Sequence, residues 1–167
     1  VKGDAANTTT FSDDIGATAA LTNILIGTEA GVSLNATFNQ TVKAGIILIG
    51  NSDDNADETY IVNFINGAAE TVSGSISEVR SADTTTINFS EAAGDDATPT
   101  VITVTDTVAV DTIAVGSVTA GGHAKFNSAV TATLVEVDGG SHATEISQIN
   151  FVSDVNAEVN LDKNAGG

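Results

Sequence analysis

The pattern that decides the fold is clearest in the stretch Phe126-Asn127-Ser128-Ala129-Val130-Thr131-Ala132-Thr133, in which a phenylalanine is followed by valine at plus four and alanine at plus six. The same register recurs after other phenylalanines, with apolar residues at plus four and plus eight. Four copies keep this register and two are degenerate: Phe11, Phe38, Phe126 and Phe151 against Phe64 and Phe89. A recurring register of this kind predicts a repeat architecture.

The spacing of the phenylalanines indicates the size of the repeat. Successive phenylalanines are 27, 26, 25, 37 and 25 residues apart. A step of about 25 residues without helices fits one coil of a parallel β-solenoid, in which like positions of neighbouring coils stack about 4.8 Å apart. We therefore expect the phenylalanines to form an interior ladder. The longer step predicts an insertion, for which residues 106–122, rich in valine and glycine, are the candidate.

Alternation of apolar and polar residues supports an all-β fold. The segment from Val155 to Leu161 places apolar residues at every second position, which is typical of a half-buried strand. Antiparallel sandwiches also alternate in this way, so one or two Ig-like or pilin-like domains are the alternative fold. We expect a single repetitive domain over residues 1–167, with tandem β repeats over 1–80 and 81–167 as the alternative.

Composition narrows the possible partners. The chain carries 22 acidic and 5 basic residues, for a formal net charge of -17. Binding to nucleic acid needs clustered Lys and Arg, so a nucleic-acid partner is not expected. There is no apolar run of about 18 residues, so we also expect no membrane insertion of this segment. The absence of cysteine removes disulfides and thiolate metal sites.

The residues after Phe38 and Phe126 resemble the rungs of a known class of repeats. Phe38-Asn39-Gln40-Thr41-Val42-Lys43-Ala44-Gly45 and the stretch from Phe126 are similar to the repetitive passengers of bacterial autotransporters, including rickettsial outer-membrane surface proteins. The resemblance implies an exported β-helix that serves in adhesion or in a surface coat. The expected location is accordingly extracellular, at the cell surface.

One acidic turn is a candidate calcium site. Asp53, Asn55, Asp57 and Glu58 offer carboxylate and amide oxygens within one short segment, and such oxygens are the ligands that calcium prefers. The segment lacks the glycine and the bidentate glutamate of an EF-hand. A solvated acidic turn is the alternative interpretation. Calcium is therefore the one cofactor that the sequence suggests.

Enzymatic activity is not expected. His123 and His142 each follow a pair of glycines and have no zinc-motif spacing, which predicts exposed loop histidines. Sugar-degrading clefts commonly use Trp and Tyr platforms, whereas this chain has only Tyr60. We therefore predict no catalytic residues.

The remaining hypothesis is a structural role through self-association or contact with neighbouring surface proteins. A surface layer, a filament subunit and an adhesin stalk would all assemble through β-strand contacts. Few Lys and a single Pro are available to block open sheet edges. The N-terminal segment is a candidate donor strand, with Ala5, Asn7, Thr9 and Phe11 as its assembly residues. A calcium-dependent module that binds glycan or protein is the alternative function.

Overall fold

The computed structural model describes residues 8–27, 33–52, 58–66, 69–92, 100–117, 120–138 and 147–162. These residues form a single 13-stranded sheet and contain no helix. The strands are β1 (Thr8–Phe11), β2 (Leu21–Ile26), β3 (Leu34–Phe38), β4 (Val42–Ile49), β5 (Thr59–Asn66), β6 (Glu70–Glu78), β7 (Thr84–Glu91), β8 (Val101–Val104), β9 (Val108–Val115), β10 (Gly122–Phe126), β11 (Val130–Asp138), β12 (Ser147–Phe151) and β13 (Val155–Asp162).

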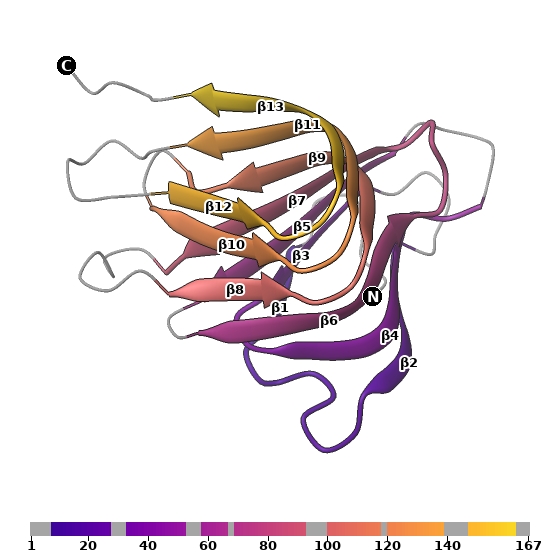
Figure 1. Ribbon diagram of the computed structural model, residues 1–167. Helices are drawn as coiled ribbons and strands as arrows, with labels where there is room; N and C mark the ends of the chain where they lie inside the picture. The colour runs from indigo at the N-terminus through magenta and orange to yellow at the C-terminus, as the bar shows by residue number, and fades with distance from the viewer. Residues whose placement is uncertain are drawn as a thin grey trace.

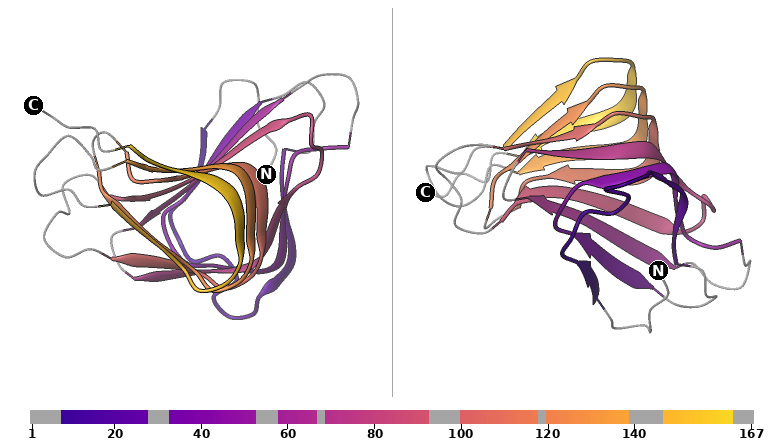
Figure 2. Two further views of the ribbon diagram at one scale, coloured as in Figure 1. Left: turned by 45° about the horizontal axis from the view of Figure 1, so that its top comes forward. Right: turned by 90° about the horizontal axis from the view of Figure 1, so that it is seen from below.

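All pairings between these strands are parallel, and each strand pairs with a strand of a neighbouring coil. The inner strands pair on both sides, whereas β1, β2, β12 and β13 pair on one side within the described ranges. The chain thus winds around one axis and forms a stack of coils, as Figures 1 and 2 show. The predicted parallel β-solenoid with coils of about 25 residues is confirmed. The antiparallel sandwich is excluded, because an antiparallel sheet would pair the strands in opposite directions.

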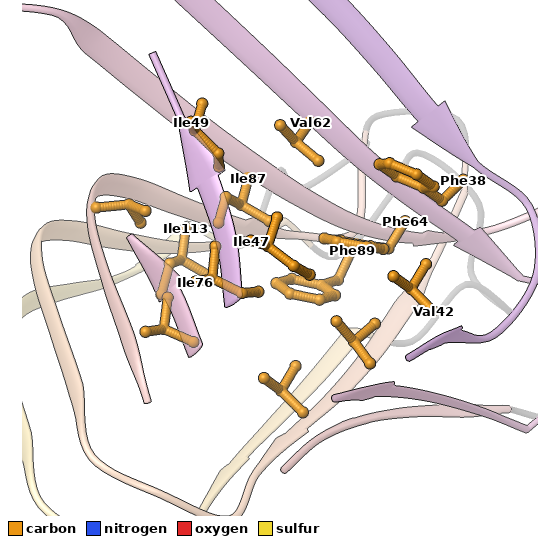
Figure 3. Close-up of a cluster of buried hydrophobic side chains, with 14 of the residues drawn as sticks. Phe38, Val42, Ile47, Ile49, Val62, Phe64, Ile76, Ile87, Phe89 and Ile113 are labelled. Atoms are coloured by element: carbon orange, nitrogen blue, oxygen red, sulfur yellow. The ribbon is translucent and has the colours of Figure 1, made fainter. Parts of the chain in front are cut away.

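The first four phenylalanines form the predicted interior ladder. Phe11, Phe38, Phe64 and Phe89 occupy equivalent positions of β1, β3, β5 and β7. Their rings are stacked with centroids 4.9, 5.5 and 5.3 Å apart. Figure 3 shows Phe38, Phe64 and Phe89 in a row beside aliphatic side chains. Apolar side chains from every face fill the interior, so the axis of the solenoid is a packed core.

The ladder does not continue to Phe126, and here the sequence interpretation is wrong. Val115 of β9 takes the next position above Phe89, 26 residues further along the chain. Residues 106–122 are therefore not an insertion, because β9 is an ordinary strand of the coil. Phe126 instead pairs with Val104 and Phe151, which form a second stack on another face. The rings of Phe89 and Phe126 meet edge to face at 89° across the core.

The repeated register describes a local structure that occurs at two different corners. After Phe38 it covers the end of β3, a tight turn and the start of β4. After Phe126 and Phe151 it covers the same strand-turn-strand unit at the β10–β11 and β12–β13 corners. Phe38 ends a strand of the first face, and Val42 begins the next face of the same coil. On that second face, Val42, Val72 and Val104 stack in successive coils, and Phe126 occupies the next position of the same stack. The strand-turn-strand unit that begins at Phe126 therefore starts one face later in the coil than the unit that begins at Phe38.

A sharp bend in β6 joins two of these faces. The first half of β6 pairs with β8 and its second half pairs with β9. Gly74 lies between the halves and has a backbone φ of 109°, which residues with a Cβ rarely adopt. A Cβ at this position would lie 2.5 Å from the Ala44 carbonyl oxygen. Glycine is therefore required for the close approach of neighbouring coils at this corner.

The amide side chains of Asn35, Asn63 and Asn88 form a ladder on the outer surface of β3, β5 and β7. Asn63 Nδ2 donates to Asn35 Oδ1 at 2.7 Å, and Asn88 Nδ2 donates to Asn63 Oδ1 at 2.7 Å. Each bond joins one coil to the next, parallel to the backbone ladder. The ladder holds the coils in register from the outside while the phenylalanines stack inside.

Candidate functional site

Three of the four residues predicted to bind calcium, Asp53, Asn55 and Asp57, lie outside the described residues. Glu58 is described and is only 3% exposed. Tyr60 and Asn51 are among the neighbours that hold its side chain: Tyr60 Oη donates to Glu58 Oε2 at 3.2 Å, and Asn51 Nδ2 donates to Glu58 Oε1 at 3.4 Å. Glu58 is therefore a buried carboxylate rather than part of a solvated surface turn.

Asp83 meets Glu58 from the next coil. The Glu58 amide donates to Asp83 Oδ1 at 3.3 Å, and the Thr84 amide donates to the Glu58 carbonyl at 2.8 Å. Asp83 is also 3% exposed, and the Arg80 guanidinium lies 3.5 Å from its Oδ1. Its second oxygen, Oδ2, is buried and has no hydrogen-bond partner among the described residues.

Two further carboxylates lie close to this pair. Asp111 Oδ2 accepts a hydrogen bond from the Thr85 amide at 2.9 Å. Glu78, at the end of β6, has a buried oxygen, Oε2, without a hydrogen-bond partner in the described structure. We call Glu58, Glu78, Asp83 and Asp111 the carboxylate corner. It gathers acidic side chains from successive coils near the corner that leads into β5 and β7, the strands that carry Phe64 and Phe89.

Burial and like charges shift the protonation equilibria at the carboxylate corner. Desolvation, together with the charges of Asp111 and Asp83, raises the pKa of Glu78 to about 7 from its ordinary value of 4.5. Desolvation also raises the pKa of Asp83, with the charge of Glu58 adding to the effect. The pKa of the Tyr60 hydroxyl is raised by burial and by the neighbouring Glu58. The corner therefore favours either protons or a positively charged partner.

These shifts predict that stability depends on pH. Because the folded-state pKa of Glu78 lies near 7 and its unfolded-state value near 4.5, the folded protein binds more protons between these values. The unfolding free energy should then fall as the pH rises from 4.5 to 7. Glu78→Gln should reduce this slope in urea titrations at several pH values. Glu136→Gln, which changes an exposed glutamate of β11, should leave the slope as it is. An unchanged slope in Glu78→Gln would contradict the assignment.

The predicted calcium site stays a prediction. Among the described residues, no group of three or more His, Cys, Asp or Glu side chains has the geometry of a metal site. The sequence interpretation missed Asp83 as a neighbour of Glu58. The signal was present, because Asp83 follows Glu58 by 25 residues, the length of one coil.

His123 is not an exposed loop histidine, so that prediction is wrong for it. It lies in β10 and is only 6% exposed. Its Nδ1 lies 3.9 Å from Glu91 Oε1, and its Nε2 is buried without a hydrogen-bond partner in the described part of the chain. His142 lies outside the described residues. The burial of His123 comes from strand placement that the neighbouring glycines did not reveal.

The strands at the two ends of the described stack form a second candidate site. Within the described ranges, β1 pairs only with β3, and β13 pairs only with β11. Thr9 and Phe11 of the predicted donor strand lie in β1 and pair with Ala36 and Phe38 of the same chain. Ala5 and Asn7 lie outside the described residues. At the other end, Val159 and Leu161 of β13 are 46% and 72% exposed although they occupy interior positions.

The chain matches no protein-family model, and comparisons with curated proteins and with solved structures gave no significant match. The part of the chain that the structure describes has no helix that is long and apolar enough to cross a membrane.

Proposed function

We propose that this protein is a non-enzymatic structural component of the cell surface, in a surface layer, a filament or an adhesin stalk, and that it assembles through β-strand contacts. A repetitive solenoid with a continuous apolar interior suits a passive structural role. The acidic, cysteine-free composition and the resemblance to surface passengers are consistent with an extracellular location.

The observation that carries the proposal is the edge of β13. Leu161 belongs to the interior stack that runs through Phe89, Val115 and Val137, yet most of its side chain is exposed. An unpaired edge with exposed apolar side chains is a template for pairing with another strand. Burial of this surface against one more coil would be favourable by about 25 cal/mol per Å² of apolar area.

A second copy of the chain is the partner that fits this edge. β1 offers a parallel edge at the other end of the same stack, and Phe11 stands there in the position that follows Leu161 in the coil repeat. β1 and β2 contain no charged residue, although the chain carries a net charge of -17. Charged side chains usually protect an edge strand from pairing with another chain, so the absence of charge on β1 and β2 favours such pairing. A contact between unlike ends does not close on itself and generates a filament.

Assembly should depend on the apolar edge of β13. Leu161→Lys places a charge at the interior position of the exposed edge, where pairing would bury it. Mass measurements over a range of concentrations should show species larger than one chain for the unmodified protein and single chains for Leu161→Lys. Val101→Lys, an exposed change on β8 in the middle of the stack, should assemble like the unmodified protein. Assembly that persists in Leu161→Lys would exclude this edge.

A calcium-dependent module that binds glycan or another protein is the second candidate. The buried carboxylates Glu58 and Asp83 favour it, because a cation would balance their charge. Calcium-dependent binding to a glycan array, with single chains at all concentrations, would favour this function over assembly.

A further inference from the structure

We propose that the carboxylate corner binds a divalent cation with oxygen ligands, of the calcium type, between Glu58 of one coil and Asp83 of the next. The inference does not depend on the proposed structural role. Its ligands are described residues of two neighbouring coils, so the cation would fasten one coil to the other. It differs from the turn suggested by the sequence in that Asp83 supplies the second carboxylate.

The charge balance at the corner is the first argument. Glu58, Glu78, Asp83 and Asp111 bring four carboxylates together, and Arg80 brings one guanidinium to 3.5 Å from Asp83 Oδ1. A charge removed from water is costly unless it is paired. The chain has only five basic residues against 22 acidic ones, so positive charge for buried carboxylates is scarce within the chain.

The second argument is an oxygen atom that lacks a partner. Asp83 is 97% buried, and its Oδ2 accepts no hydrogen bond within the described structure. This atom lies near Gly50, where a Cβ would be 3.1 Å away. The other oxygen, Oδ1, accepts from the Glu58 amide at 3.3 Å. The Glu58 side chain also acts directly on the Asp83 carboxyl, so the two carboxylates are close neighbours.

The chemistry of the neighbouring groups fits a hard cation. Calcium takes 6 to 8 oxygen ligands from carboxylates, amides, backbone carbonyls and water. The corner offers the carboxylate oxygens of Glu58 and Asp83; Asn51 Nδ2 and the Tyr60 hydroxyl orient the Glu58 carboxylate as hydrogen-bond donors. It offers neither sulfur nor imidazole ligands among these residues, which disfavours zinc and copper.

Tyr60 makes the site directly observable. It is the only tyrosine, and the chain has no tryptophan, so fluorescence excited above the phenylalanine band comes from this one side chain. Its hydroxyl donates to Glu58 Oε2, and a carboxylate acceptor quenches tyrosine emission. A cation that engages Glu58 should therefore change the emission of Tyr60.

The experiment is a calcium titration of the chelator-treated chain at pH 8, read by Tyr60 emission and by Tm. We expect a saturable change in emission. We also expect a rise in Tm of about 5 °C or more at a calcium concentration a hundredfold above Kd. Asp83→Asn should weaken calcium binding at least about tenfold, because one charged ligand is lost. Asp154→Asn, an exposed change in the turn before β13, should bind like the unmodified chain.

Three results would overturn the proposal. One is the absence of any change in Tyr60 emission and Tm at about 10 mM calcium or magnesium, roughly tenfold above the Kd of the weakest extracellular sites. A second is equal affinity in Asp83→Asn and the unmodified chain, which would place the cation elsewhere. The third is an equal calcium affinity in Glu58→Gln and in the unmodified chain, which would remove Glu58 from the site. Should Asp83→Asn fail to fold, the titration of the unmodified chain and of Glu58→Gln decides.

Discussion

Phe64→Ala is expected to lower the unfolding free energy by about 3 to 5 kcal/mol, the usual loss when a fully buried aromatic side chain is truncated. Phe64 is 1% exposed and is stacked between Phe38 and Phe89. The substitution removes both ring contacts and leaves a cavity that the neighbouring coils cannot fill without breaking their backbone register.

Urea unfolding followed by circular dichroism measures this loss. Phe151→Ala is the matched control, because Phe151 is only partly buried and has a single ring neighbour, Phe126. We expect Phe151→Ala to cost roughly 1 to 2 kcal/mol, since less of the removed side chain is shielded from water. Equal losses at the two positions would contradict the interior ladder, because the two rings would then be equally buried.

The sequence was sufficient to predict the coil length and the first phenylalanine ladder. Phe11, Phe38, Phe64 and Phe89 recur at nearly constant intervals, and like positions of a solenoid must stack. Alternation showed which side chains point inward. Both signals come directly from the geometry of parallel strands, so they survive without knowledge of the corners.

The face on which Phe126 and Phe151 lie could not be predicted in the same way. The register after a phenylalanine specifies a strand, a turn and a second strand, and this unit looks the same at every corner of the coil. Val115 holds the ladder position after Phe89, but valine is common in this chain and gave no distinct signal. Only the pairing of β7 with β9 reveals that the unit has moved by one face.

The candidate cation site shows the same limit and one missed opportunity. The sequence predicted a calcium site in the acidic turn that ends at Glu58, because the carboxylates of this turn are adjacent in sequence. Asp83 became a neighbour only through the coil, although its distance of 25 residues from Glu58 equals the repeat already found in the phenylalanines. Applying the repeat to charged as well as apolar residues would have brought the two carboxylates together.

Head-to-tail stacking predicts a specific pair of neighbours between two molecules. If Phe11 of one copy follows Leu161 of another in the stack, then Thr10 lies beside Asn160, and both side chains are exposed. Neighbouring strands are about 4.8 Å apart, which is within the range that a disulfide can bridge. The chain contains no cysteine, so two introduced thiols would be the only ones present.

Oxidative cross-linking of the double variant Thr10→Cys, Asn160→Cys is therefore the most direct test of assembly. We predict a ladder of disulfide-linked trimers and longer chains on a non-reducing gel. Each single variant should give dimers at most, and the pair Thr10→Cys, Thr133→Cys, whose second site lies on β11 one coil inside the edge, should give no ladder. Protein that assembles by mass yet forms no ladder in the first variant would contradict the stacking of β1 on β13. Protein that remains a single chain at every concentration would contradict the structural role itself.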